Sequence, residues 1–130
     1  MLVVDASALL DGITTQNHPL SLLVRDHELA APALIDLELA QTMRRAVRAG
    51  LLSPDEAYER LAFLTETPGL SRFEHSALVE RIWELRDNFT AYDASYVALA
   101  EQLAATLVTT DLRLAEASRR HASCEVITPG

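Results

Sequence analysis

Short apolar runs alternate with helical patterns along the whole chain, and this alternation constrains the fold more than any other feature. Five apolar runs predict strands, at residues 1–5, 29–32, 70–73, 105–110 and 125–128. The other segments predict helices, at residues 6–12, 19–27, 32–50, 53–65, 76–86, 90–104 and 111–119. Strands joined through helices need crossover connections, so the order predicts an α/β fold of three layers around a mostly parallel sheet. The 130 residues suit one domain spanning 1–130.

Local signals mark the ends of several predicted helices. Pro32 and Gly50 bracket one of them, because helices favour proline in the first turn and glycine just past the last. Ser53 and Thr90 are predicted N-caps, since their hydroxyls can accept a hydrogen bond from the first turn. Gly12 is expected to end the first helix.

Four carboxylates fall where these strands end or where the adjoining helices begin. Asp5 ends the first run and Asp111 follows the fourth, while Glu38 and Asp93 lie in the first turns of helices. Ligands of parallel sheets bind beyond the carboxyl ends of the strands, so the four acids are expected at one edge. Taken singly, Asp93 with Thr90 resembles a capping box and Asp111 can be an N-cap. Together, the four would repel one another unless a cation lies among them.

Oxygen ligands of this kind suit Mg²⁺ or Mn²⁺, which take one or two carboxylates together with waters and substrate phosphate oxygens. Such an ion polarises a phosphoryl oxygen and lowers the pKa of a bound water, and a second ion can stabilise the leaving oxygen. The sequence therefore predicts phosphodiester cleavage without a nucleophilic side chain, and it leaves open whether one or two ions take part.

Composition excludes several other chemistries. All 11 basic residues are Arg, so a Walker-A loop, a Schiff-base enzyme and a receiver domain lack their lysine. The single Cys124 permits neither an internal disulfide nor a Cys-based zinc site. The net charge of -8 argues against simple electrostatic binding to nucleic acid, so phosphate contacts would have to come from arginines. The first residues do not resemble a signal peptide and no apolar stretch is long enough for a membrane span, so a cytoplasmic location is expected.

Four stretches carry a resemblance to a known family. They are Val-Val-Asp5-Ala-Ser7-Ala-Leu-Leu, Pro32-Ala-Leu-Ile-Asp-Leu-Glu38, Tyr92-Asp93-Ala-Ser-Tyr-Val-Ala-Leu-Ala-Glu101 and Val108-Thr-Thr110-Asp111-Leu-Arg-Leu. As an ordered set that extends from residue 3 to the last strand, they resemble the PIN domain, and more closely the VapC-type toxins of bacterial toxin–antitoxin pairs. The third stretch is the most specific of the four.

The resemblance implies a three-layer α/β/α fold and a Mg²⁺- or Mn²⁺-dependent endoribonuclease. It assigns catalysis and metal binding to four acids, with supporting hydroxyls at two further positions: Asp5, Glu38, Asp93, Asp111, Ser7 and Thr110. Asp5 and Asp93 match the firmest metal ligands of the family. Some members carry a further acid after the fourth, and the next acid here is Glu116. Asp36 lies two helical positions from Glu38, so both cannot face one site.

The resemblance also implies partners. They are an RNA substrate, a small cognate antitoxin whose basic or aromatic segment occupies the acidic groove, and a second copy of the chain in a homodimer. Two other interpretations of the same fold are a catalytically silent binding module and a DNA-directed PIN nuclease. Neither the target RNA nor the antitoxin can be identified from the sequence.

Several arginines have two interpretations. Arg86 can contact RNA or the antitoxin, or it can complement the dipole at the end of its helix. Arg44, Arg45 and Arg48 can form an RNA-backbone strip near Glu38, or an ordinary solvated face. Trp83 is expected in the core or in a dimer interface rather than as a base-stacking platform.

Overall fold

The computed structural model describes residues 1–14 and 19–129, and within these residues five strands form one parallel sheet. The strands are β1 (Leu2–Val4), β2 (Leu29–Pro32), β3 (Leu70–Phe73), β4 (Thr106–Val108) and β5 (Val126–Ile127). Their order is β3-β2-β1-β4-β5, which places β1 in the centre. Val4 at the end of β1 pairs with Val108 at the end of β4, so these two strands finish level with each other.

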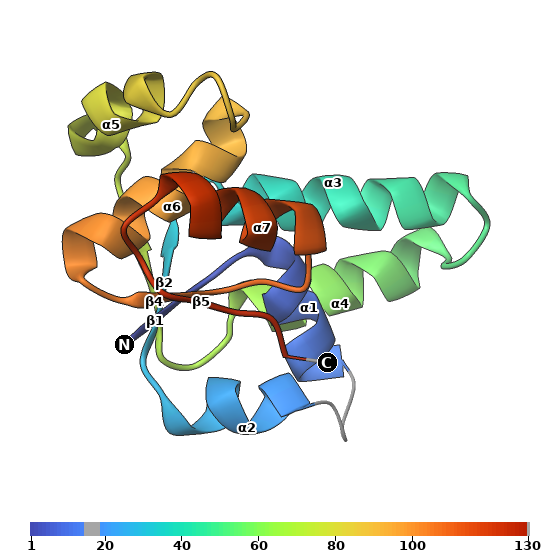
Figure 1. Cartoon of the computed structure of the whole chain (residues 1–130). Helices are drawn as coiled ribbons and strands as arrows, with labels where there is room; N and C mark the ends of the chain where they lie inside the picture. The colour runs from blue at the N-terminus through green and yellow to red at the C-terminus, as the bar shows by residue number, and fades with distance from the viewer. Residues whose placement is uncertain (15–18, 130) are drawn as a thin grey trace.

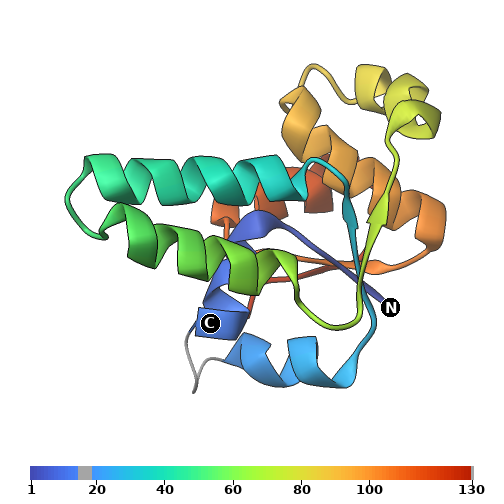
Figure 2. The same cartoon turned by 180° about the vertical axis from the view of Figure 1, so that it is seen from behind.

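Helices cover both faces of this sheet. They are α1 (Ala6–Thr14), α2 (Pro19–Asp26), α3 (Ile35–Arg48), α4 (Pro54–Thr65), α5 (Val79–Glu84), α6 (Ala91–Leu103) and α7 (Leu112–His121), with the 3-10 turn η1 (Ser76–Leu78) before α5. Figure 1 shows α6 and α7 on one side of the sheet and α1 and α2 on the other. The α3–α4 hairpin extends to one side, as Figure 2 shows from behind. The three-layer α/β/α prediction is therefore confirmed.

Helix α6 is the most deeply packed of the described helices. Residues 94–100 are all buried, and the helix lies against β1, β2 and β4. Thr90 caps it by accepting a hydrogen bond from the Asp93 amide, as predicted. Because the helix is buried nearly all round, side chains in its first turn are held on a rigid element at the edge of the sheet.

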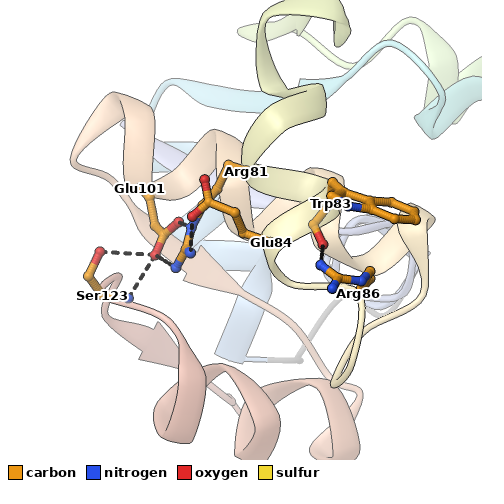
Figure 3. Close-up of polar contacts among 6 residues, drawn as sticks. All are labelled: Arg81, Trp83, Glu84, Arg86, Glu101 and Ser123. Atoms are coloured by element: carbon orange, nitrogen blue, oxygen red, sulfur yellow. Dashed lines mark hydrogen bonds and ion pairs between the residues drawn. The ribbon is translucent and has the colours of Figure 1, made fainter.

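The short helix α5 is fastened to α6 by a carboxylate at the far end of α6. Glu101 accepts hydrogen bonds from Arg81 Nε at 2.8 Å and from Arg81 Nη2 at 3.1 Å (Figure 3). It also accepts bonds from the amide and the hydroxyl of Ser123, at 2.9 and 3.0 Å. The bonds to Arg81 and Ser123 hold the pKa of Glu101 below its usual range. One carboxylate thus joins α5, α6 and the segment that leads into β5.

Three predicted boundaries are wrong. Helix α1 continues through the buried Gly12 to Thr14, since a helical glycine costs only about 1 kcal/mol. Pro32 ends β2 opposite Phe73 of β3, so α3 begins at Ile35 instead of at the proline. The predicted 76–86 helix consists of η1 followed by α5, which ends at Glu84. Ser53 does cap α4, through a complete capping box with Glu56.

Among the described residues, no helix combines the length and the apolar character that a membrane crossing requires.

Ala104, which ends α6, generates the first testable prediction. It is exposed and adopts a left-handed conformation with φ of 49°, and this turn lets the Ala105 amide bond to the Ala100 carbonyl at 2.9 Å. A left-handed alanine costs roughly 1–2 kcal/mol, whereas glycine adds about 0.4–1 kcal/mol of unfolded-state entropy, so Ala104→Gly should stabilise the fold by about 0.5–1 kcal/mol. Urea denaturation measures this difference.

Ala49→Gly is the matched control, because Ala49 ends α3 with a right-handed φ of -81°. There the same substitution should destabilise the protein by roughly 0.5–1 kcal/mol. Equal effects of the two variants would contradict the assignment of strain to Ala104.

Candidate active site

Asp5 lies directly after β1, at the carboxyl end of the central strand, with only 7% of its surface exposed. Its Oδ1 accepts hydrogen bonds from the Ser7 hydroxyl at 2.7 Å and from the Ala8 amide at 2.8 Å. Its Oδ2 accepts a hydrogen bond from the hydroxyl of Thr109, which follows β4. The first turn of α1 and the end of the neighbouring strand therefore orient this carboxylate together.

Glu38 reaches the same edge of the sheet from the first turn of α3. It is half-buried, and its Oε1 accepts a hydrogen bond of 2.6 Å from the hydroxyl of Tyr96. Tyr96 belongs to the buried stretch of α6 and is 1% exposed, so its ring has a fixed position. The orientation of Glu38 is thus set by a helix that lies 58 residues further along the chain.

Asp93 and Asp111 lie at the starts of α6 and α7. Asp93 is in the first turn of α6, where its amide donates the N-cap hydrogen bond to Thr90 at 3.1 Å. Asp111 is the N-cap of α7, and its Oδ1 accepts hydrogen bonds from the amides of Arg113 at 3.0 Å and Leu114 at 3.3 Å. The N-cap expectation for Asp111 is confirmed, and its other carboxylate oxygen carries no part of the cap.

Burial and mutual repulsion shift the pKa values of three of the four acids. Burial raises the pKa of Asp5, Glu38 and Asp93 above the usual range. Repulsion from neighbouring acids raises each pKa further. Asp111 raises the pKa of Asp5, and Asp93 and Asp5 raise that of Glu38. Asp111 and Asp5 raise the pKa of Asp93. Like charges that repel one another in this way favour a bound cation.

The chemistry of this donor set fits a hard divalent ion. Carboxylate oxygens that repel one another are the ligands that Mg²⁺ and Mn²⁺ prefer. Within the part of the chain that the structure describes, no three or more Asp, Glu, His and Cys side chains form a group that could hold a metal ion by themselves. Mg²⁺ needs only one or two carboxylates, because waters and substrate phosphate oxygens complete its shell.

Other residues singled out in the sequence lie around the four acids in different ways. Ser7 donates to Asp5, while Thr110 offers its backbone amide to the Ser7 hydroxyl at 3.3 Å. Asp36 turns away from Glu38, as its helical position predicts, and pairs with Arg72 of β3 through bonds of 2.7 and 2.8 Å. Glu116 is exposed and forms an ion pair with Arg120 at 3.2 Å.

The arginines fall into three separate places. Arg45 borders a pocket that contains Glu38, whereas Arg44 and Arg48 line another pocket, between α3 and α4. Arg86 stacks on the ring of Trp83 at 4.7 Å and donates to the Trp83 carbonyl at 3.0 Å (Figure 3). Trp83 is 66% exposed in this chain, so it does not belong to the core.

Two residues of the site were not found by sequence reasoning. The hydroxyl that reaches Asp5 from the β4 segment belongs to Thr109, one position before Thr110. Tyr96 lies three residues after Asp93, so helical spacing alone places the two on one face of α6. That spacing was the available signal for Tyr96. Successive residues of a strand point to opposite faces, so the sequence alone does not show whether Thr109 or Thr110 faces Asp5 until the strand register is known.

Comparisons with known proteins find relatives of the whole chain. A family model described as the PIN domain matches residues 2–120. Ribonuclease VapC9 of Mycobacterium tuberculosis (strain ATCC 25618 / H37Rv) is 38% identical over 127 residues, which cover 98% of each chain.

Two solved structures share the fold. PAE2754 from Pyrobaculum aerophilum has a TM-score of 0.74 and 24% identity, over 98% of this chain and 83% of that one. VapBC2 from Rickettsia felis, solved with a DNA fragment from its promoter, has a TM-score of 0.69 and 14% identity, over 97% of this chain and 96% of that one. At these identities the likeness extends to the fold alone.

The raised pKa of Asp93 generates a prediction about stability. Because this pKa is higher in the folded protein than in the unfolded chain, folding becomes less favourable as the pH rises from about 4 through the folded value. Asp93→Asn should therefore unfold at higher denaturant concentration than the parent protein at pH 7 in EDTA, and this gain should disappear near pH 3. Urea denaturation across this pH range measures the effect.

Asp55→Asn controls for the general loss of one negative charge, since Asp55 is an exposed acid in the first turn of α4. It should give no comparable gain, because an acid there favours the helix dipole. If the difference in stability between the parent protein and Asp93→Asn did not change with pH, the proposed crowding of the acids would be contradicted.

Proposed function

The chain belongs to the PIN-domain family, and from that membership we propose that it is a VapC-type toxin, an endoribonuclease that hydrolyses phosphodiester bonds of RNA. The observation that carries the proposal is the crowding of Asp5, Glu38 and Asp93 at the carboxyl edge of the sheet, with a raised pKa for each. A fold that retained these acids for structure alone would gain stability by losing them. A catalytically silent binding module is therefore disfavoured.

Hydrogen bonds orient two of the acids of the proposed site, and a third lies on a well-packed helix. Asp5 is oriented by Ser7, Ala8 and Thr109, and Glu38 by Tyr96. Asp93 is carried by the rigid first turn of α6. Fixed ligands of this kind reduce the reorganisation that catalysis requires.

Asp5 and Asp93 would be the principal ligands of Mg²⁺ or Mn²⁺, with Glu38 and Asp111 as further candidate ligands, while waters and substrate phosphate oxygens would complete the shell. When bound, the ion supplies Lewis acidity at the phosphoryl oxygen and makes water a stronger nucleophile. The four carboxylates supply the negative charge that attracts the ion, and their fixed positions determine where it binds.

The proposal includes protein partners. A small cognate antitoxin with a basic segment would complement both the acidic site and the net charge of -8, and electrostatic complementarity of this kind favours fast and selective association. A homodimer is proposed on the same family membership.

Substitution of the principal ligands tests the site. Loss of a residue that merely orients a metal ligand costs about 10–100-fold, so Asp5→Asn and Asp93→Asn should each lower RNA cleavage by at least about 100-fold. Both variants should also relieve growth inhibition when expressed in bacteria. Cleavage of labelled RNA by the purified variants, alongside branched DNA substrates, measures the loss and separates RNA from DNA activity.

Asp55→Asn serves as the control here as well, since it removes an exposed carboxylate from α4 and should cleave like the parent protein. Circular dichroism checks that each variant is folded. Undiminished cleavage by a folded Asp5→Asn or Asp93→Asn variant would overturn the site assignment, and preferential cleavage of branched DNA would overturn the substrate class.

Thr109 is proposed as a positioning residue, because its hydroxyl donates to the Asp5 carboxylate from a fully buried position. Thr109→Val keeps the shape and removes the hydroxyl, so it should lower cleavage by about 10–100-fold and raise the Mn²⁺ concentration needed for half-maximal rate. Thr109→Ser keeps the donor and should retain most of the activity. Equal activity of the valine and serine variants would show that the bond to Asp5 has no functional role.

A further inference from the structure

A pocket of about 380 Å³ lies between the first turns of α3 and the start of α6, lined by Glu38 and by Ala6 and Tyr92, the chain neighbours of Asp5 and Asp93. Ala6, Leu37, Glu38, Gln41, Arg45 and Tyr92 are among the residues that line it. Glu38 belongs to both places, because its Oε1 accepts the bond from Tyr96 while its side chain borders the pocket. Anything held in this pocket is therefore adjacent to the proposed site of cleavage.

Two apolar side chains in the lining are uncovered. Leu37 is 74% exposed and Tyr92 is 65% exposed, although both stand at the edge of the densely packed centre of the protein. An aromatic ring beside an aliphatic side chain offers the kind of surface against which a flat ring system packs. Burial of these two side chains in a complex would remove apolar surface from water.

Two polar side chains of the pocket, those of Gln41 and Arg45, are available to a ligand. Among the residues that the structure describes, Gln41 makes no hydrogen bond through its amide and Arg45 forms no ion pair, and both side chains are exposed. Arg45 does lie close enough to lower the pKa of Glu38. A carboxamide offers both donors and an acceptor to the edge of a base, and a guanidinium offers a fork that matches phosphate.

We propose that this pocket binds one unpaired nucleobase of the RNA, next to the phosphate that is cleaved. Tyr92 and Leu37 pack on the base, Gln41 contacts its hydrogen-bonding edge, and Arg45 contacts the adjoining backbone phosphate. The base must be unpaired, because stacking on a side chain and contact with its edge both require that it leave a duplex. This inference rests on the proposed ribonuclease function and adds a subsite that selects the cleavage position.

RNA binding without metal tests the subsite separately from catalysis. Fluorescence anisotropy in EDTA would measure the affinity of labelled single-stranded homopolymers of A, C, G and U, and of a duplex of the same length. Since stacking of one base on an aromatic side chain contributes substantially to affinity, Tyr92→Ala should weaken binding of the preferred homopolymer on the order of tenfold. Tyr92→Phe keeps the ring and should bind like the parent protein.

Tyr58→Ala is the matched control, because Tyr58 is 71% exposed on α4 and borders the other pocket, between α3 and α4. It should leave RNA affinity unchanged. Equal weakening by Tyr92→Ala and Tyr58→Ala, or equal binding of duplex and single strand by the parent protein, would overturn the subsite.

Base selection is tested on a mixed-sequence RNA with metal present. Gln41→Ala should alter which base flanks the cleaved bonds while substantial cleavage continues, as sequencing of the products would show. Unchanged cleavage positions in Gln41→Ala together with normal RNA affinity of Tyr92→Ala would refute the subsite and leave the ribonuclease proposal standing. Absence of any RNA cleavage by the parent protein would instead refute the ribonuclease proposal, on an assay that does not depend on the pocket variants.

Discussion

A carboxylate buried at the end of the central strand is the constraint on which the rest of this site depends. Burial raises the pKa of Asp5, and the hydrogen bonds from Thr109, Ala8 and Ser7 act in the opposite direction. Those donors come from the end of β4 and from the first turn of α1, so they are in place only when β1 and β4 pair in register and α1 begins at Ala6. The ionised form of Asp5 is thus supported by the same pairings that build the sheet, and the site cannot form before the fold.

The remaining acids are held against their mutual repulsion by elements that are rigid for other reasons. Helix α6 is buried on nearly every side, so Asp93 and Tyr96 keep their positions whether or not the charges around them are neutralised. Glu38 is fixed in turn by Tyr96. A site of this kind lowers the stability of the protein and is maintained by packing elsewhere, which is the usual relation between an active site and its scaffold.

Much of this arrangement could be predicted from the sequence, because it follows from short-range rules. Apolar runs that end in Asp5 or precede Asp111 define strand ends, and parallel strands place those ends at one edge. What could not be predicted depends on long-range contacts: Pro32 is held in β2 by pairing with β3, and Tyr96 contacts a glutamate 58 residues away. The choice of Thr109 over Thr110 likewise needs the strand register. The separation of Arg45 from Arg44 follows from helical phase, since neighbouring residues on a helix point about 100° apart.

The distribution of the arginines bears on how a chain with a net charge of -8 would bind the proposed RNA substrate. Arg72, Arg81 and Arg120 are paired with acids, so their charge is largely used within the protein. Nonspecific affinity for nucleic acid grows with the number of phosphates that cations neutralise, and the excess of acids over arginines opposes it here. Under the proposed function, binding depends on short-range contacts at the site, such as those of the Tyr92 ring and of the Arg45 guanidinium. Under the proposed function, a chain with this excess of acids leaves the choice of RNA to the shape of the site rather than to its net charge.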